Sequence, residues 1–396
     1  AGTGVGKSMA YLVPAVLTAR ANNITVGVAT KTNALLDQLV YHELPALKEA
    51  FGSLSFAPLK GFSHYPCLRR VDKLVSEGPQ VREVAGKEYS QAPCLAALLS
   101  YIEQTEYDDM DALKIDYRVL SRRTVTTSSN DCLRRKCPYY GHLCFVHGAR
   151  RLAESADVVV TNHSLLFCDL AADGGLLPPI RYWVVDEAHG AEAEARRAFS
   201  ISLSAEKIGR LSQRVAAADS PRNVFARAER RVAACQREEK ATLFYALSGK
   251  ARTAGTAFSQ AANEFLQHMK DLLFFDASKR SKGYDHVELW INDDVRRSET
   301  FSCVASFGKA MSAVAEALVT ACQEIVGYLE DVEGAAEVQR EIASIAMELK
   351  DTMHAAEVIF ERPSDSYVYS AMLNRKNDKA NDLLEASLVN VGEKLE

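Results

Sequence analysis

The chain opens with the stretch that decides its fold class, Ala1-Gly2-Thr3-Gly4-Val5-Gly6-Lys7-Ser8. This stretch matches the phosphate-binding loop (P-loop) pattern, except that Ala1 replaces the opening glycine. Glycines let successive backbone N–H groups face one set of phosphate oxygens, and a helix beginning near Lys7 directs its positive end there. Lys7 adds a cation for the β- and γ-phosphates of ATP, and Ser8 adds a hydroxyl for Mg²⁺. A glycine-rich turn that only caps a helix is the simpler reading, but Lys7-Ser8 favours a nucleotide site.

Three short apolar runs predict buried parallel strands, at residues 24–30, 157–161 and 182–185. Each run ends in polar residues, so Lys31, Asn162 and Asp186 are expected at the carboxyl ends of the strands. Ligands bind beyond these ends in open α/β sheets. We therefore expect the three segments to belong to one nucleotide-binding domain.

Asp186-Glu187-Ala188-His189 follows the third run, which places two carboxylates at the tip of a buried strand. An Asp-Glu pair at this position often only caps the next helix. Together with the loop at residues 1–8, it indicates a metal site instead. Asp186 would hold Mg²⁺, Glu187 would orient or deprotonate the attacking water, and His189 would couple the site to the rest of the protein.

The composition of the 396 residues is that of a globular protein, with 47% hydrophobic and 25% charged residues. No apolar run looks long enough to cross a bilayer, so we expect no membrane partner. The net charge is -5, which excludes a global attraction to nucleic acid and leaves only a local basic site. Nine cysteines, an odd number, suit a reducing, cytoplasmic setting better than a disulfide framework.

Four of these cysteines form a candidate metal-binding set: Cys67, Cys132, Cys137 and Cys144. Four thiolates can hold either zinc or an iron–sulfur cluster, and the spacing alone does not decide between them. The other five are expected to be buried free thiols: Cys94, Cys168, Cys235, Cys303 and Cys322.

Residues 118–151 carry eight Arg and Lys residues against the single acid Asp131, a local charge of +7. Such a segment suggests a groove for a phosphate backbone, although a solvated basic face is the plain alternative. Nearby aromatic residues are candidates for stacking on unpaired bases, while some must pack the small domain: Phe62, Tyr65, Tyr139, Tyr140 and Phe145.

Residues 201–361 have helical periodicity, with three apolar stripes that predict helices packed against one another. The stripes begin at Phe258, Met311 and Val338. After Pro363, residues 366–373 and 384–391 have short strand-like patterns, which we expect to return to the parallel sheet.

The motifs together resemble the DinG/XPD group of iron–sulfur superfamily-two DNA helicases, and in particular its bacterial DinG branch. The resemblance rests on the P-loop, the segment from Thr30 to Leu39, the step Thr161-Asn162-His163-Ser164-Leu165 and the DEAH box at residues 186–189. It implies a RecA-like P-loop NTPase domain with a parallel sheet, interrupted by a small iron–sulfur domain and a helical arch. The implied bounds are residues 1–60 and 153–200 for the ATPase domain, 61–152 for the iron–sulfur domain, 201–362 for the arch and 363–396 for the return to the ATPase domain.

The resemblance also implies a function: 5′ to 3′ movement on single-stranded DNA, separation of forked duplexes, and a role in DNA repair. It maps a structural [4Fe–4S] cluster onto Cys67, Cys132, Cys137 and Cys144 and leaves Cys94 outside. Thr30 to Asn33 would contact the DNA backbone.

Two alternatives remain open at this point, a nucleic-acid clamp that uses ATP without translocating and a zinc-stabilised RNA-binding ATPase. The resemblance implies a strand before the P-loop and a second motor lobe that supplies an arginine. Because neither is recognised in the 396 residues, we expect these residues to be a fragment that is inert as a motor by itself.

Overall fold

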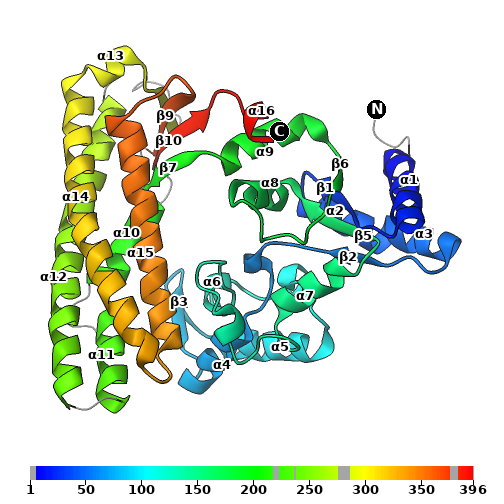
Figure 1. Ribbon diagram of the computed structural model, residues 1–396, viewed down its shortest axis with the longest axis horizontal. Coiled ribbons are helices and arrows are strands. Elements are labelled where there is room, and N and C mark those ends of the chain that lie inside the picture. Colours follow the sequence, from blue (N-terminus) through cyan, green and yellow to red (C-terminus); the bar gives the residue numbers. More distant parts are fainter. Residues whose placement is uncertain (1–5, 217–222, 236–237, 275–285, 375–381, 396) are drawn as a thin grey trace. The chain divides into compact units, whose positions relative to one another are not determined.

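The computed structural model describes residues 6–216, 223–235, 238–274, 286–374 and 382–395 (Figure 1). The chain divides into two compact units, Ala1–Phe199 and Ser200–Lys394. The first unit contains the predicted ATPase segments 1–60 and 153–200 (to Phe199) and the predicted cysteine domain.

A four-stranded parallel sheet forms the centre of the first unit. Its order is β2-β5-β1-β6, with β1 at Val26–Thr30, β2 at Phe56–Pro58, β5 at Val158–Asn162 and β6 at Tyr182–Val185. The three predicted strands are confirmed. Strand β2, which has three residues and ends in a proline, was not predicted from the sequence.

Helices and loops bury both faces of this sheet. Side chains of β5 alternate between two hydrophobic cores, with Val158 and Val160 in the core that contains Leu12 and Leu36, and Val159 in the core that contains Phe145. A sheet buried on both faces is typical of α/β proteins with parallel strands. The arrangement fits a RecA-like core. Its helical segments are α1 (Lys7–Asn22), α2 (Asn33–Gln38), η1 (Leu39–Glu43), α3 (Leu44–Phe51), α7 (Phe145–Glu154), α8 (His163–Ala171), η5 (Ala188–Gly190) and α9 (Ala191–Ala198).

The cysteine-rich part of the first unit has its own small core, which includes Val71, Leu98 and Met110. It consists of short elements: η2 (Phe62–His64), α4 (Leu68–Glu77), β3 (Val81–Val84), β4 (Lys87–Ser90), α5 (Ala92–Gln104), η3 (Met110–Ala112), α6 (Arg122–Val125) and η4 (Arg134–Lys136). Much of this part is loop between these short elements.

Long helices and an antiparallel sheet form the second unit. The helical segments are α10 (Ala205–Ala216), α11 (Val224–Cys235), α12 (Glu238–Met269), η6 (Lys270–Phe274), α13 (Asp293–Arg296), α14 (Glu299–Tyr328), η8 (Leu329–Asp331), α15 (Ala336–Ala356), η9 (Glu357–Glu361) and α16 (Gly392–Leu395). The three predicted apolar stripes lie on α12, α14 and α15, where Phe258, Met311 and Ile342 are fully buried in one shared core. The prediction that these helices pack against one another is confirmed.

The strands predicted after Pro363 exist, but their expected partner was wrong. β9 (Tyr367–Asn374) and β10 (Leu383–Leu388) pair with β7 (Ile201–Ser204) and β8 (His286–Trp290) in a separate antiparallel sheet, in the order β7-β10-β9-β8. The inner side chains of this sheet, such as Leu384 and Ala371, complete the core of the helices. These strands therefore belong to the second unit and do not extend the parallel sheet.

One helical stretch, Glu299–Asp331, is long and apolar enough to span a membrane by length and composition alone. The expectation that no apolar run reaches this length was therefore too strict. In the second unit this stretch is a core helix, because Val304, Leu318 and Ile325 are buried against the neighbouring helices.

Candidate nucleotide site and cysteine pocket

The polar residues that follow the parallel strands meet at one edge of the sheet. Thr30 pairs with Asn162, and the Asp186 N–H donates to the Ala29 carbonyl at 2.9 Å. The Asn162 side chain caps α8 by accepting from the Leu165 N–H at 2.7 Å, and it donates to the Asn33 side chain at 2.6 Å. The polar ends of β1, β5 and β6 therefore lie together, as the strand pattern predicted.

Lys7 and Glu187 form the central contact of this edge. Lys7 Nζ lies 2.7 Å from Glu187 Oε1, although the two residues are 180 positions apart in the chain. The hydrogen bond to Glu187 raises the pKa of Lys7, and the same bond lowers the pKa of Glu187. The P-loop lysine and the acidic strand end thus share one site. Gly2, Thr3, Gly4 and Val5, the remaining predicted loop residues, lie outside the described residues.

Three further contacts hold Asp186, in addition to the bond from its N–H to Ala29. Tyr11 donates from its hydroxyl to Asp186 Oδ2 at 3.1 Å, and the Glu187 N–H donates to Oδ1 at 2.9 Å. His163, which is fully buried, lies 2.8 Å from the Asp186 carbonyl oxygen through Nε2, so this nitrogen carries the donated proton. Burial and the Asp186 carboxylate raise the pKa of Tyr11, whose hydroxyl also lies within hydrogen-bonding reach of Ser8.

Glu187 has a left-handed backbone conformation, with φ 51° and ψ 44°. A non-glycine residue in this region is uncommon and is found where the surrounding contacts hold it. The contact that His163 makes to the peptide between Asp186 and Glu187 is such a contact. Tyr11 was not singled out from the sequence, and His163 was quoted only as part of the step from Thr161 to Leu165, without a role. Their roles depend on contacts with a residue more than 20 positions away.

His189 lies between Glu187 and Lys31. Its Nδ1 is 3.2 Å from Glu187 Oε2, and its Nε2 is 3.4 Å from Lys31 Nζ. A row of side chains thus runs from Lys7 through Glu187 and His189 to Lys31, which lies in the segment predicted to contact DNA.

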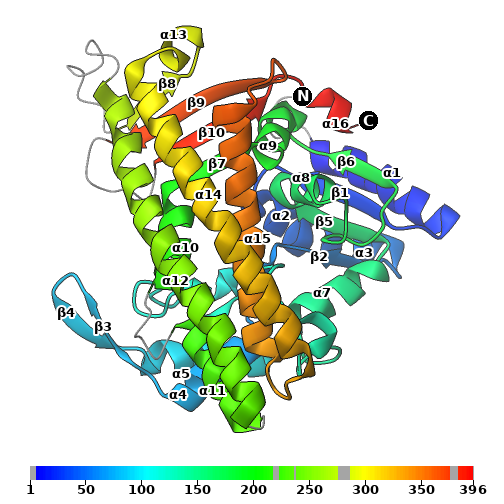
Figure 2. The ribbon, with the colours of Figure 1, turned by 60° about the vertical axis from the view of Figure 1, so that its left-hand side comes forward.

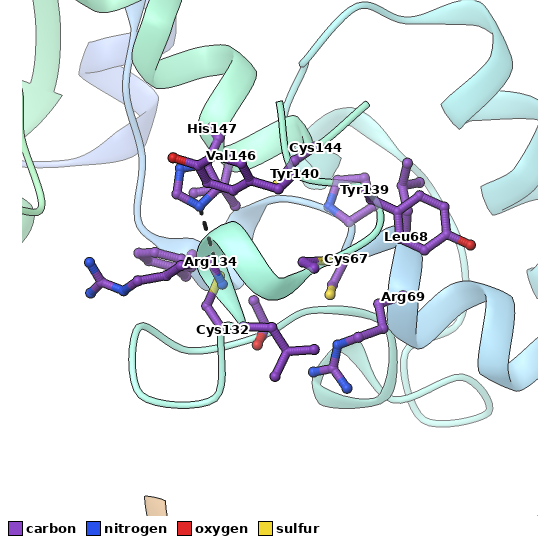
Figure 3. Close-up of a pocket in the computed structure, with 15 residues that line it drawn as sticks. Cys67, Leu68, Arg69, Cys132, Arg134, Tyr139, Tyr140, Cys144, Val146 and His147 are labelled. Carbon is purple, nitrogen blue, oxygen red and sulfur yellow. Dashed lines mark hydrogen bonds between the residues drawn. The ribbon is translucent and has the colours of Figure 1, made fainter. Parts of the chain in front are cut away.

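The four predicted cysteines line one pocket, shown in Figure 3. Cys67 precedes α4, Cys132 and Cys137 flank η4, and Cys144 precedes α7. The pocket encloses about 440 Å³, including space open to solvent. Its wall also contains His147, whose Nε2 lies 3.8 Å from Cys132 Sγ.

The surroundings of the pocket raise the pKa values of two of its thiols, Cys137 and Cys144. Burial raises the pKa of Cys144 to about 11, and the nearby Cys132, Cys67 and Cys137 contribute to the rise. Backbone hydrogen bonds act in the opposite direction. The Tyr139 N–H donates to Cys137, the His147 N–H donates to Cys144, and each bond lowers the pKa of the thiol that accepts it.

A third pocket cysteine, Cys132, also accepts a backbone hydrogen bond. The Arg134 N–H donates to Cys132 Sγ at 3.4 Å. Within the described residues, no group of three or more His, Cys, Asp or Glu side chains is arranged to hold a single metal ion.

The remaining cysteines differ from the prediction. All nine cysteines are free, but only Cys322 is buried, whereas Cys168, Cys235 and Cys303 are exposed and Cys94 is half-buried. The three exposed thiols lie on the outer faces of helices. The prediction rested on cysteine usually being buried, and this general tendency does not show which face of a helix a given cysteine occupies.

Some cations of the basic segment form ion pairs within the cysteine-rich part, and others lie on its surface. Arg118 and Arg122 form ion pairs with Asp116 and Asp111. The three consecutive cations of η4, residues 134–136, are exposed between two of the pocket cysteines. The aromatic residues divide likewise: Tyr65 and Phe145 are buried and pack the core, whereas Tyr140 is 41% exposed.

Comparison with curated proteins finds the same family that the motifs indicated. The chain is 36% identical over 228 residues to the ATP-dependent helicase DinG of Mycobacterium tuberculosis, an alignment that covers 54% of this chain and 34% of that protein. It is 34% identical over 216 residues to the helicase YoaA of Haemophilus influenzae (52% of this chain, 32% of YoaA) and 32% identical over 213 residues to DinG of Escherichia coli (50% and 29%). The chain is similar to the DinG group of helicases.

These comparisons confirm the resemblance to DinG proteins over about half of the chain. The alignments span about a third of the length of the relatives. A scan against models of known protein families finds no match.

Proposed function

We propose that the protein acts as an ATP-dependent DNA helicase whose nucleotide site lies between the P-loop and the DEAH box. The observation that supports this most is the 2.7 Å contact between Lys7 and Glu187 at the carboxyl edge of a parallel sheet. The names of the DinG and YoaA relatives point to the same activity.

In the proposed reaction, Lys7 exchanges Glu187 for the β- and γ-phosphates of ATP. The backbone N–H groups of residues 2–6 and the N-terminus of α1 bind the same phosphates. Asp186 and Ser8 would hold Mg²⁺, which supplies positive charge against the phosphate oxygens. Tyr11 lies beside both groups, which fits a site where a carboxylate and a hydroxyl bind one ion.

Glu187, once released from Lys7, orients the attacking water and accepts its proton. Its position is set by the left-handed turn that His163 supports and by the contact with His189. Because His189 also contacts Lys31, a change at the DNA-facing end of β1 alters the surroundings of Glu187. This gives a physical path between DNA contact and ATP hydrolysis.

The proposed substrates are single-stranded DNA and forked duplex DNA. The protein would move 5′ to 3′ along the single strand, in the cytoplasm. The exposed cations of η4 and the segment from Thr30 to Asn33 are the proposed contacts to phosphates. The second unit is the proposed helical arch. Translocation needs a second motor lobe that closes on ATP, so we propose that these residues act within a two-lobed motor.

The cysteine pocket is proposed to hold a structural [4Fe–4S] cluster. Four cysteines line the pocket, and three of them accept backbone N–H groups, as thiolate ligands do. In such a cluster each thiolate binds a different iron, so the sulfurs stand farther apart than around one zinc ion.

The function is tested with the complete protein on forked duplexes that carry either a 5′ or a 3′ single-stranded tail. We expect ATP-dependent strand separation only with the 5′ tail, and we expect Glu187→Gln to bind DNA but not to separate strands. The matched control is Glu49→Gln, because Glu49 is an exposed acid on α3 away from the site. ATP hydrolysis and DNA binding without strand separation by the unaltered protein would support the clamp instead.

The cluster is tested by metal analysis and visible absorption of the purified protein. We expect Cys137→Ser to lose iron and the visible band, and Cys94→Ser, in the same part of the chain but outside the pocket, to keep both. A colourless protein that contains zinc would instead favour the zinc-stabilised alternative.

A further inference from the structure

A two-stranded hairpin projects from the cysteine-rich part of the first unit (Figure 2). It consists of β3 (Val81–Val84) and β4 (Lys87–Ser90), which pair with each other and with no other strand among the described residues. Ala85 and Gly86 have φ angles of 52° and 76°, the left-handed pair that a tight two-residue hairpin turn requires. A Cβ atom on Gly86 would have no neighbour within 4 Å in the part of the chain that the structure describes, so the tip is open on that side.

The hairpin buries almost nothing, yet its base is firmly anchored. Every residue from 81 to 90 is exposed except Val84, which is half-buried. At the base, Gln91 is 2% exposed, pairs with the backbone of Gln80 at 2.9 Å and donates to the Val119 carbonyl at 3.0 Å. The anchor joins the hairpin to the start of the basic segment, beside Arg118.

The register separates charges onto the two faces of the hairpin. Arg82 pairs with Tyr89, and Val84 pairs with Lys87, so both cations and the tyrosine share one face. Glu83 lies directly opposite Glu88 on the other face. Like charges directly opposite each other destabilise a strand pair, and an isolated hairpin has little stability to lose. Hairpin stability alone does not account for this pattern.

We propose that the face formed by Arg82, Lys87 and Tyr89 is a contact surface for single-stranded DNA. The two cations suit the phosphate backbone, and Tyr89, 44% exposed, offers a ring on which an unpaired base can stack. Arg118, which interacts electrostatically with Tyr89, is 76% exposed but already paired with Asp116, so the proposed contact rests on Arg82, Lys87 and Tyr89. The two glutamates repel phosphates from the opposite face and so fix which side the strand follows.

This surface is separate from the cysteine pocket, since no residue of the hairpin lines that pocket. The choice of DNA over another polyanion rests on the proposed function. The contact itself rests on the charge pattern of the hairpin.

The test compares two double variants of the purified protein that remove charge from opposite faces, Arg82→Gln/Lys87→Gln and Glu83→Gln/Glu88→Gln. Binding of a fluorescently labelled oligothymidine is followed by anisotropy over a range of salt concentrations. We expect the first variant to bind several-fold more weakly and to reduce the slope of log affinity against log salt by about 1.4, because each lost phosphate contact accounts for about 0.7. The second variant should bind at least as tightly as the unaltered protein.

Tyr89→Ala tests stacking separately from charge. We expect it to weaken binding by about fivefold to a hundredfold with an unchanged salt slope. A second measurement reports proximity rather than affinity, so a change in the stability of the hairpin affects it less. A photo-crosslinking amino acid at position 89 should label the oligonucleotide, and one at position 81, on the opposite face, should not.

Several results would overturn the proposal. These are wild-type affinity and slope in the arginine–lysine variant, equal losses in both double variants, and crosslinking from position 81 alone. A hairpin that binds a protein strand or an anionic membrane would give the first of these results. If the hairpin variants weaken DNA binding but the complete protein hydrolyses no ATP, the proposed function fails and this inference stands.

Discussion

Lys60 is a buried cation that joins the parallel-sheet part of the first unit to the cysteine-rich part. Its side chain is 1% exposed, and Nζ lies 2.8 Å from Asp37 on α2, 2.9 Å from Asp109 and 3.0 Å from Asp111. Burial alone lowers the pKa of Lys60, but the hydrogen bonds to Asp37 and Asp109 outweigh it and the pKa is raised. The ammonium group therefore stays charged at every physiological pH.

Replacing Lys60 by methionine should destabilise the first unit by about 3–5 kcal/mol, because the nearly buried Asp109 is left without its cation. The measurement is the free energy of unfolding in urea, followed by a spectroscopic probe in the first unit. Lys48→Met, at an exposed position of α3, is the control and should change this free energy by less than about 0.5 kcal/mol. Equal stability of the two variants would contradict the account of Lys60.

Asp111 gives the same junction a pH dependence. Burial raises the pKa of Asp111, but hydrogen bonds from His64, Arg122 and Lys60 outweigh it, so the folded pKa is lowered below the ordinary value. A lowered folded pKa means that the stability gained is present above the unfolded pKa of about 3.9 and is lost as the pH falls through the folded value.

Asp111→Asn should therefore have its largest destabilising effect at pH 7. The difference in the free energy of unfolding between this variant and the unaltered protein should shrink as the pH falls below about 4. Urea unfolding at several pH values measures this. A difference that stays constant down to acidic pH would show that the charge of Asp111 is not what matters.

These residue-scale contacts were beyond prediction from the sequence. Lys60 and Tyr11 belong to no quoted motif, and His163 belongs to one that assigns it no contact. Each acquires its role from partners between 23 and 175 positions away. Lys7 and Glu187 were predictable because each belongs to a motif whose chemistry requires the other.

Among the elements, α7 depends on the close approach of an aromatic ring. A Cβ atom at Gly148 would lie only 2.1 Å from the ring of Tyr107, whose hydroxyl donates to the His142 carbonyl at 2.6 Å. Tyr107 also packs edge-on against Phe145. Because Cys144 lies between His142 and α7, the ring stabilises the approach of the chain to the cysteine pocket.

Gly148→Ala should force Tyr107 out of this position and destabilise the protein by about 1–3 kcal/mol through overpacking. Iron content after purification should fall as well. Gly249→Ala in α12 is the matched control, since a Cβ atom there meets no described residue within 4 Å. It should stabilise the protein by about 0.5–1 kcal/mol. Thermal unfolding of both variants checks the prediction, which fails if Gly148→Ala is neutral.

The elements themselves were largely predictable from periodicity. Apolar runs identified β1, β5 and β6, and three- and four-residue spacing identified α12, α14 and α15. The pairing of β9 and β10 was not predictable, because strand-like alternation shows which face is buried but not which strand lies alongside. The hairpin β3–β4 has no apolar face and therefore gave no signal.

Across the whole molecule, the two compact units separate the proposed tasks. The first unit brings the P-loop lysine, the DEAH box and the cysteine pocket into one body, and the second unit packs its helices over an antiparallel sheet. The P-loop lysine and the DEAH box come together because the carboxyl edge of a parallel sheet brings together residues that are far apart in the sequence.

The central claim, that Lys7 and Glu187 form one nucleotide site, is tested most directly by calorimetric titration of the protein with MgATP. The account predicts one binding site, a loss of affinity of about tenfold or more in Lys7→Ala, and retained binding in Glu187→Gln and in the surface control Lys48→Ala. Wild-type affinity for MgATP in Lys7→Ala would contradict it.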